Sequence, residues 1–235
     1  MRILVAPDKF KGTASAQTVA ESIRSALGDD HEILIQPLAD GGEGTLEAFG
    51  GSNRTDVVSG PLNSPVSAQW RLHGDTAIIE MAQASGLTLA GGLEDNDPIA
   101  ASTIGTGQLI AMAIERGARN ILVGAGGSAT TDGGLGALEA LYPLERLREV
   151  SITVACDVAT RFVEAAETFG PQKGASRSQV RFLKRRLERV GQIYLEERGV
   201  DVLQMEMAGA AGGLAGGLAS VGASLVNGFS AVSEE

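Results

Sequence analysis

Hydrophobic and polar positions near the N-terminus predict a strand, a helix and a second strand. Residues 2–6 begin with Arg2 and continue as an apolar run of the kind found in buried parallel strands. Apolar residues then recur every four positions between Ser15, a typical helix N-cap, and Gly28, a typical stop. A second apolar run covers residues 33–38. Two strands joined through a helix by short links predict a βαβ unit with a parallel sheet.

Beyond residue 54 the pattern changes. Apolar and polar residues alternate over 66–72, and residues 73–75 have the composition of a hairpin turn that leads into a strand at 76–80. This change from helix–strand alternation to a hairpin predicts a domain boundary near Gly60.

The same periodicities predict the later elements. They are a helix at 107–116, strands at 120–123 and 152–156, a helix at 133–141, and a long helix from Ser176, which forms a capping box with Gln179, to Gly199. We expect the basic run 184–186 on the long helix to be a solvated face. The uncharged segment 207–226 is long enough to cross a bilayer, but it lacks basic flanks, so we expect a packed internal helix.

Composition and charge narrow the class of partner. The 235 residues, of which 43% are hydrophobic and 20% charged, can bury a globular core. A net charge of -10 argues against nucleic acid and anionic membranes as partners. The single cysteine, Cys156, excludes an internal disulfide and suits a reducing compartment. We therefore expect a cytoplasmic protein with a small-molecule substrate, and the oligomeric state, a homodimer included, is left open.

The first candidate site is the loop of residues 6–12, which follows the first predicted strand. Open α/β sheets bind their ligands at such strand ends. Asp8, Lys9 and Lys11 lie in this turn, and its lysines could hold a phosphate or a carboxylate. An exposed turn with solubilising charges is the alternative.

The second candidate site is the loop of residues 39–45. Asp40 and Glu43 stand three residues apart among glycines, so they could reach one Mg²⁺, or one of them could accept a proton. An ordinary loop with Glu43 at the positive end of a helix explains the pattern equally well.

The third candidate, residues 122–134, has the strongest pattern. A buried strand runs into glycines, three hydroxyl side chains and Asp132, so the loop amides could form a nest for polyphosphate oxygens. The spacing Gly124-x-Gly126-x-x-Ala129 also matches a dinucleotide fingerprint, which keeps a dinucleotide-dependent oxidoreductase as an alternative. A Walker-type loop is excluded because the sequence has no Gly-Lys dipeptide.

Six motifs together resemble the class I glycerate kinase family. Its members carry, in this order, A-P-D-S-F-K-G, A-D-G-G-E-G-T, G-G-S-A-T-x-D-G-G, A-C-D-V, F-G-P-Q-K-G-A and G-A-A-G-G-L. The corresponding segments here are residues 6–12, 39–45, 126–134, 155–158, 169–175 and 209–214. The sequence departs at Lys9, where the family usually has Ser, and at Thr131, where Asn is common.

The resemblance implies an α/β fold of two domains, in which a second α/β domain is inserted into a parallel-sheet, Rossmann-like first domain. Residues 1–60 would form the N-terminal part of the first domain, 61–224 the inserted domain, and 225–235 the return towards the first. Family members continue beyond the position of Phe229 with a segment that includes T-G-E-G-R-x-D. The resemblance implies that this segment completes the first domain and part of the cleft, so we expect residues 1–235 alone to lack activity.

The resemblance also implies ATP-dependent phosphorylation of D-glycerate, with Mg²⁺ as the metal and 2-phosphoglycerate, rather than 3-phosphoglycerate, as the product. A non-catalytic protein that binds sugar acids is a second alternative. The expected nucleotide-binding residues are Gly126, Gly127, Ser128, Ala129, Thr130 and Gly133. The expected catalytic residues are Asp132, Asp40 and Lys11, of which Asp40 and Asp132 would also bind the metal. The expected substrate-binding residues are Asp8, Lys9, Glu43, Gln172 and Lys173.

Overall fold

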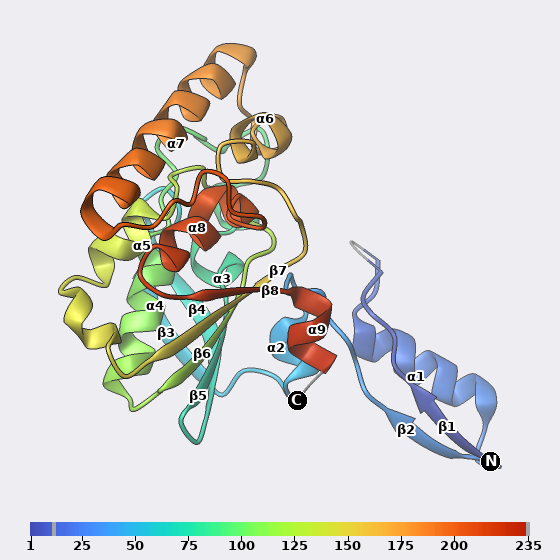
Figure 1. Ribbon diagram of the computed structural model, residues 1–235. Coiled ribbons are helices and arrows are strands. Elements are labelled where there is room, and N and C mark those ends of the chain that lie inside the picture. Colours follow the sequence, from blue (N-terminus) through green and yellow to red (C-terminus); the bar gives the residue numbers. More distant parts are fainter. Residues whose placement is uncertain (11–12, 234–235) are drawn as a thin grey trace.

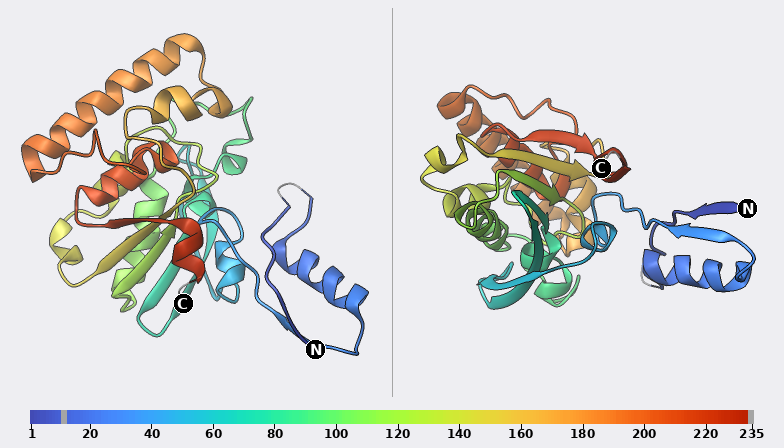
Figure 2. Two further views of the ribbon diagram at one scale, coloured as in Figure 1. Left: turned by 45° about the vertical axis from the view of Figure 1, so that its right-hand side comes forward. Right: turned by 90° about the horizontal axis from the view of Figure 1, so that it is seen from below.

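The computed structural model describes residues 1–10 and 13–233, and it contains two separate β-sheets. The smaller sheet pairs β1 (Arg2–Val5) with β2 (Glu32–Ile35) in parallel, and α1 (Ala16–Leu27) connects them. This unit stands beside a larger body in all three views (Figures 1 and 2). The predicted βαβ unit is therefore confirmed.

The bounds of α1 follow from its predicted caps. The hydroxyl of Ser15 accepts a hydrogen bond from the Thr18 N–H, and the Gly28 N–H donates to the Arg24 carbonyl. A cap of this kind satisfies backbone groups that the helix itself leaves without partners.

The larger sheet has six strands in chain order. They are β3 (Arg54–Ser59), β4 (Pro65–His73), β5 (Thr76–Glu80), β6 (Asn120–Gly124), β7 (Ser151–Cys156) and β8 (Ser224–Asn227). The first three are antiparallel, which confirms the predicted hairpin, and β5 to β8 are parallel. The chain leaves the smaller sheet after Ile35 and enters the larger sheet at Arg54, so β3 belongs to the larger sheet. The boundary near Gly60 and the three domain ranges stay predictions.

Helices cover both faces of the larger sheet. They are α2 (Thr45–Ala48), α3 (Ala82–Ser85), α4 (Ile104–Glu115), α5 (Leu135–Ala140), α6 (Ala165–Phe169), α7 (Arg177–Arg198), α8 (Leu214–Ala219) and α9 (Gly228–Ser233), with short 3-10 helices η1 (Thr88–Ala90), η2 (Leu144–Leu147), η3 (Pro171–Lys173) and η4 (Ala210–Gly213). Figure 1 shows α2 and α9 on one side of the sheet and most of the other helices on the opposite side. The predicted α/β class is confirmed.

Alternation along the strands divides the core into two layers. Ile78 and Leu122 contact Leu46 of α2, whereas their neighbours Ile79 and Val123 belong to the large cluster on the other face. Adjacent residues of a strand point to opposite faces, so a central strand covered on both sides is apolar throughout. The large cluster also contains Trp70, whose side chain is fully buried.

Two predicted helices differ from those observed. Helix α4 begins three residues earlier than predicted and includes Gly105 and Gly107, where an added Cβ would lie 1.9 Å from the Ser59 oxygen and 2.3 Å from the Ala137 oxygen. Glycine, usually unfavourable in a helix, here permits close packing. The second difference concerns residues 207–226.

The prediction of one helix over residues 207–226 is wrong. This segment forms η4, α8 and most of β8, because Ala211 and Gly212 adopt left-handed backbone angles with φ of 53° and 66°. Left-handed residues cannot continue a right-handed helix. Among helices built from the described residues, none combines the length and apolarity needed to span a bilayer.

Candidate functional site

Three of the predicted motifs meet through backbone contacts at the carboxyl ends of the parallel strands. An added Cβ on Gly126 would lie 2.5 Å from the Gly42 Cα, and one on Gly41 would lie 2.6 Å from the Ala155 oxygen. The Gly126 N–H donates to the Gly41 carbonyl at 3.3 Å. These positions accept only glycine, which explains why residues 39–45 and 126–134 are rich in it.

The last motif, residues 209–214, packs against the second half of the 126–134 loop. The Gly133 N–H donates to the Gly212 carbonyl at 3.1 Å, and an added Cβ on Gly212 would lie 1.9 Å from the Thr130 oxygen. The 126–134 loop is therefore held between two glycine-rich segments that are distant in sequence.

A cleft of about 420 Å³ opens beside this loop, and we call it the central cleft. Its lining consists of Glu43, Leu87, Thr88, Ala125, Gly126, Gly127, Ser128, Asp157, Val158, Phe169, Gln172, Lys173 and Ala211. The structure thus brings six predicted site residues into one cleft: three of the expected nucleotide-binding residues and three of the expected substrate-binding residues. Asp157 follows β7 directly and was not among the predicted site residues.

Three other predicted nucleotide-binding residues do not line the cleft. Ala129 and Thr130 have no exposed surface, and Gly133 is also buried. The hydroxyl of Thr130 donates to the Ala211 carbonyl at 3.4 Å. In this structure the three residues form the base of the loop, whereas Gly126, Gly127 and Ser128 form its surface towards the cleft.

Lys173 is the buried amine of the central cleft. Only 4% of its surface is exposed, and its Nζ donates to the Ser128 Oγ at 2.7 Å and to the Thr130 carbonyl at 2.6 Å. Burial lowers the pKa of Lys173 to about 7, and the negative charge of Asp132 partly opposes this shift. The side chain of Asn96, which the sequence did not single out, donates to the Lys173 and Ala129 carbonyls at 2.8 and 3.1 Å.

Asp132 is 6% exposed and lies in a hydrogen-bond network outside the lining of the central cleft. One carboxylate oxygen accepts from the Thr103 N–H, the Thr103 hydroxyl and the Gly136 N–H at 2.9, 2.8 and 3.3 Å. The other accepts from the Gly134 N–H at 3.1 Å. The carboxylate therefore joins the 126–134 loop to the first residues of α4 and α5. Its assignment as base or metal ligand stays a prediction.

Lys9 and Asp40, taken from two different motifs, form an ion pair of 3.0 Å. The Gly42 N–H donates to the same Asp40 oxygen at 3.0 Å. Burial alone would lower the pKa of Lys9 and raise that of Asp40, but their mutual hydrogen bond and attraction prevail. The pKa of Lys9 is therefore raised and that of Asp40 lowered. Asp8 is exposed, and its carboxylate lies 3.7 Å from the Lys9 Nζ.

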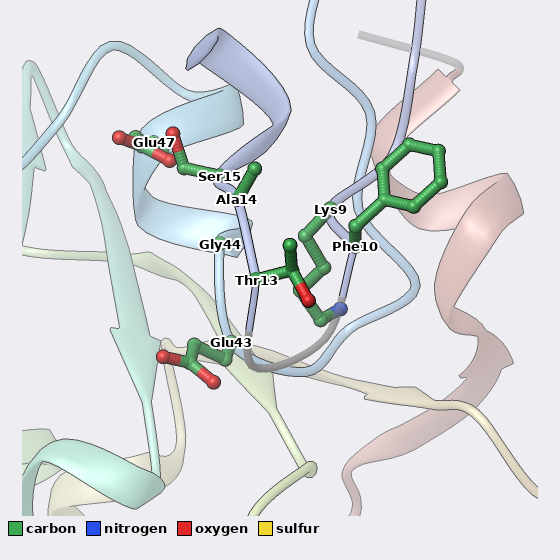
Figure 3. A pocket seen from close by; sticks show the side chains of 8 residues that line it. All are labelled: Lys9, Phe10, Thr13, Ala14, Ser15, Glu43, Gly44 and Glu47. Carbon is green, nitrogen blue, oxygen red and sulfur yellow. The ribbon is translucent and has the colours of Figure 1, made fainter. Parts of the chain in front are cut away.

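A second hollow of about 290 Å³ lies between the first loop and α2 (Figure 3). It is lined by Lys9, Phe10, Thr13, Ala14, Ser15, Glu43, Gly44 and Glu47. Glu43 lines both this hollow and the central cleft, so the 39–45 loop contributes to both. The predicted catalytic residue Lys11 lies outside the described residues.

The described residues contain no group of three or more His, Cys, Asp or Glu side chains that could hold a metal ion. Asp40 and Asp132, predicted to share one Mg²⁺, belong to separate hydrogen-bond networks. The proposed metal role of this pair stays a prediction.

Two further residues support the site, although the sequence patterns did not identify them. Glu80, 4% exposed, ends β5 and accepts from the Gly44 and Leu46 N–H groups at 2.9 and 2.8 Å, so it holds the 39–45 loop. Burial raises the pKa of Glu80. Arg186 donates from α7 to the Ile99 and Thr131 carbonyls. The prediction of a fully solvated basic run is therefore wrong for Arg186.

The chain is similar to proteins of one family along its whole length. The model of the glycerate kinase family matches residues 3–142 and 143–235. The glycerate 2-kinase of Escherichia coli K12 is 39% identical over 273 residues, which cover 99% of this chain and 71% of the relative. The glycerate kinase of Halalkalibacterium halodurans is also 39% identical, over 92% of this chain and 67% of the relative.

A solved structure agrees with this sequence relationship. The crystal structure described as glycerate kinase 2 from Salmonella typhimurium LT2 superposes with a TM-score of 0.85 at 35% identity, over 100% of this chain and 73% of that one. Similarity of sequence and of fold therefore lead to the same family. The chain belongs to the glycerate kinase family, whose members are phosphotransferases.

Proposed function

We propose that the protein transfers the γ-phosphoryl group of ATP to D-glycerate in the central cleft and forms 2-phosphoglycerate. Membership of the family supports glycerate as the acceptor, and the name of the E. coli relative, glycerate 2-kinase, supports the position of transfer. The observation that carries the proposal is the convergence of Gly126, Gly127, Ser128 and Lys173 on one cleft.

These groups match what phosphoryl transfer requires of a protein. The reaction spreads negative charge over the transferring phosphoryl oxygens, so catalysis depends on donors and cations fixed at that position. The backbone amide at Gly127, the Ser128 hydroxyl and the Lys173 amine are such donors, whereas the Gly126 amide is held by the Gly41 carbonyl. Gly127 is exposed, and Lys173 lines the cleft with its amine fixed by two hydrogen bonds, so both are positioned to meet a ligand there.

Mg²⁺ would enter the cleft with the nucleotide. This cation commonly retains several waters and is held by one or two carboxylates together with substrate phosphates. Glu43 or Asp157 would hold it there, because both line the central cleft, whereas Asp132 lies outside the lining. When bound, the cation would neutralise charge on the phosphates. Lys9 and Gln172 would contact the acceptor, as expected from their motifs.

The oxidoreductase alternative lacks the structural context that its fingerprint requires. In a dinucleotide fold the glycine spacing leads directly into a helix that receives the pyrophosphate. Here the segment after β6 remains a loop through Gly134, and α5 begins only at Leu135. The match of Gly124-x-Gly126-x-x-Ala129 is therefore a property of spacing alone.

An ADP-release assay with the full-length protein tests the proposal. We expect release only when ATP, D-glycerate and Mg²⁺ are all present, and little release with glycerol, because glycerol lacks the carboxylate. The phosphorus NMR signal of the product distinguishes the two positions: one proton on the phosphorylated carbon gives a doublet, whereas two give a triplet. Lys184→Ala, on α7 and outside the lining of the central cleft, serves as the matched control.

Three results would contradict separate parts of the proposal. Turnover in excess chelator would reject Mg²⁺, and a triplet would reject 2-phosphoglycerate. Glycerate binding without any ADP release would favour the non-catalytic alternative.

A further inference from the structure

Lys173 is a buried amine whose partners are neutral oxygens. Its Nζ contacts the Ser128 hydroxyl and the Thr130 carbonyl, and no carboxylate of the described chain lies within ion-pair distance of it. An ammonium has three hydrogens to donate, and these contacts use two of them. The side chain lines the central cleft, so the remaining hydrogen has a ligand site beside it.

The charged groups around Lys173 do not supply a contacting counter-ion. Asp132 attracts it from a distance, but that carboxylate is engaged by Thr103 and by two amides. Arg186 contributes a further positive charge at the Thr131 carbonyl. Glu43 and Asp157 line the same cleft, and the Phe169 ring lies 6.0 Å from the amine. A buried cation without a contacting anion is unfavourable, which agrees with the pKa of about 7 for Lys173.

We infer that Ser128 and Lys173 form an oxyanion site in the central cleft, and that a tetrahedral anion binding there brings one proton from solvent onto the Lys173 nitrogen. The inference rests on the proposed function, because the phosphoryl group of the nucleotide would be this anion. The lone pair of the neutral Lys173 amine accepts the proton. The bound anion then supplies the negative charge that no contacting carboxylate provides. The Lys173 ammonium then donates to the anion while it keeps its bonds to Ser128 and Thr130.

This coupling has a measurable consequence. Binding that requires one proton loses affinity about tenfold for each pH unit above the pKa of the free amine, because the neutral form must be protonated first. Above the pKa of the bound form the loss stops. An opposite charge within contact distance shifts a pKa by about 1–3 units, so we expect the bound Lys173 to titrate that much higher.

The chain offers a direct measurement, because it contains only four lysines: Lys9, Lys11, Lys173 and Lys184. Lysine labelled with ¹³C at Cε gives four methylene signals whose shifts follow protonation of the amine. Sulfate is the probe, because it is a tetrahedral dianion that does not titrate in this range. Replacing each of the other three lysines with arginine assigns the Lys173 signal without changing Lys173 itself.

We expect the Lys173 signal to titrate near pH 7 without sulfate and at least ~1 unit higher at saturating sulfate. Ser128→Ala should reduce the sulfate-induced rise. An unchanged midpoint at saturation, or absence of any sulfate effect on the Lys173 signal up to high concentration, would overturn the inference. A midpoint near 10.5 without sulfate would also overturn it.

The measurement uses neither ATP nor glycerate, so it is separate from the proposed activity. A sulfate-linked rise in a protein that never releases ADP would keep the oxyanion site and reject the kinase assignment. Turnover with glycerate, but no sulfate-linked rise in the pKa of Lys173, would keep the kinase assignment and reject the oxyanion site.

Discussion

Replacing Asp132 with asparagine separates a role in the fold from a role in the chemistry. The side chain keeps its size, but one of the two oxygens becomes an NH₂ group. If the remaining oxygen stays with Thr103 and Gly136, the new NH₂ faces the Gly134 N–H, and a buried donor loses its acceptor. The three retained hydrogen bonds also lose the strength that a charged acceptor gives them.

The expected loss in the free energy of unfolding follows from these contacts. Leaving one buried donor without an acceptor costs about 1–3 kcal/mol, and weaker acceptance in the other three bonds adds to it. Relief from burying a charge offsets part of the loss. We expect the free energy of unfolding to fall by about 2–4 kcal/mol, and in a chain of this size each kcal/mol lowers Tm by about 2–4 °C. Asp132→Asn should therefore lower Tm by about 4–16 °C.

Scanning calorimetry measures this shift, and the ADP-release assay run well below Tm measures what remains of turnover. Lys184→Ala is the control, because its ion pair with Glu167 is solvent-exposed and such pairs contribute little. An unchanged Tm combined with a loss of turnover of about 10²-fold or more would refute the structural role and make Asp132 a base or a metal ligand. A lowered Tm with normal turnover of the folded protein would reject the catalytic assignment.

Three further predictions concern the supports of the site. Gly126→Ala should force its loop away from Gly42, because the new Cβ would lie 2.5 Å from the Gly42 Cα; we expect a destabilisation of about 1–3 kcal/mol in denaturant titrations and a large loss of turnover. Glu80→Gln should change the pH profile of Tm: the pKa of Glu80 is raised above its ordinary value of 4.5, so its stabilising contribution is complete below that value and is lost as pH rises. The Tm difference between this variant and the wild type should therefore shift in favour of the variant between pH 4 and pH 7, and a constant difference would refute the assignment. Arg186→Ala should lower stability by about 1–3 kcal/mol through two lost carbonyl contacts, whereas its exposed neighbour Arg185→Ala should change little; equal effects would show that the contacts of Arg186 contribute nothing.

Elements set by local signals could be predicted from the sequence. Ser15 and Gly28 bound α1 because caps act on the nearest backbone groups, and the capping box of Ser176 and Gln179 begins α7 for the same reason. The hairpin at 73–75 also follows from neighbouring residues. Each of these signals acts within a few positions, so no knowledge of the remaining chain is needed.

Features that depend on distant partners could not be predicted. Asp132 is 29 positions from Thr103, and nothing in the loop sequence indicates that its carboxylate faces inward. Glu80 belongs to an apolar strand and contacts amides 34 and 36 positions away. Lys173 was expected from its motif, but its burial depends on the tertiary structure. A charged residue in a loop has the same sequence pattern whether it faces solvent or the core.

The glycine contacts around the 126–134 loop have a consequence for binding energetics. Gly126 rests on Gly42, and Gly212 rests on the Thr130 carbonyl, so backbone meets backbone without an intervening side chain. No rotamers need to be frozen there when a ligand arrives, and the loop amides are preorganised by backbone packing. The free energy of ligand binding is then not reduced by the cost of ordering the loop. The same rigidity leaves no flexible atom to absorb an added methyl group.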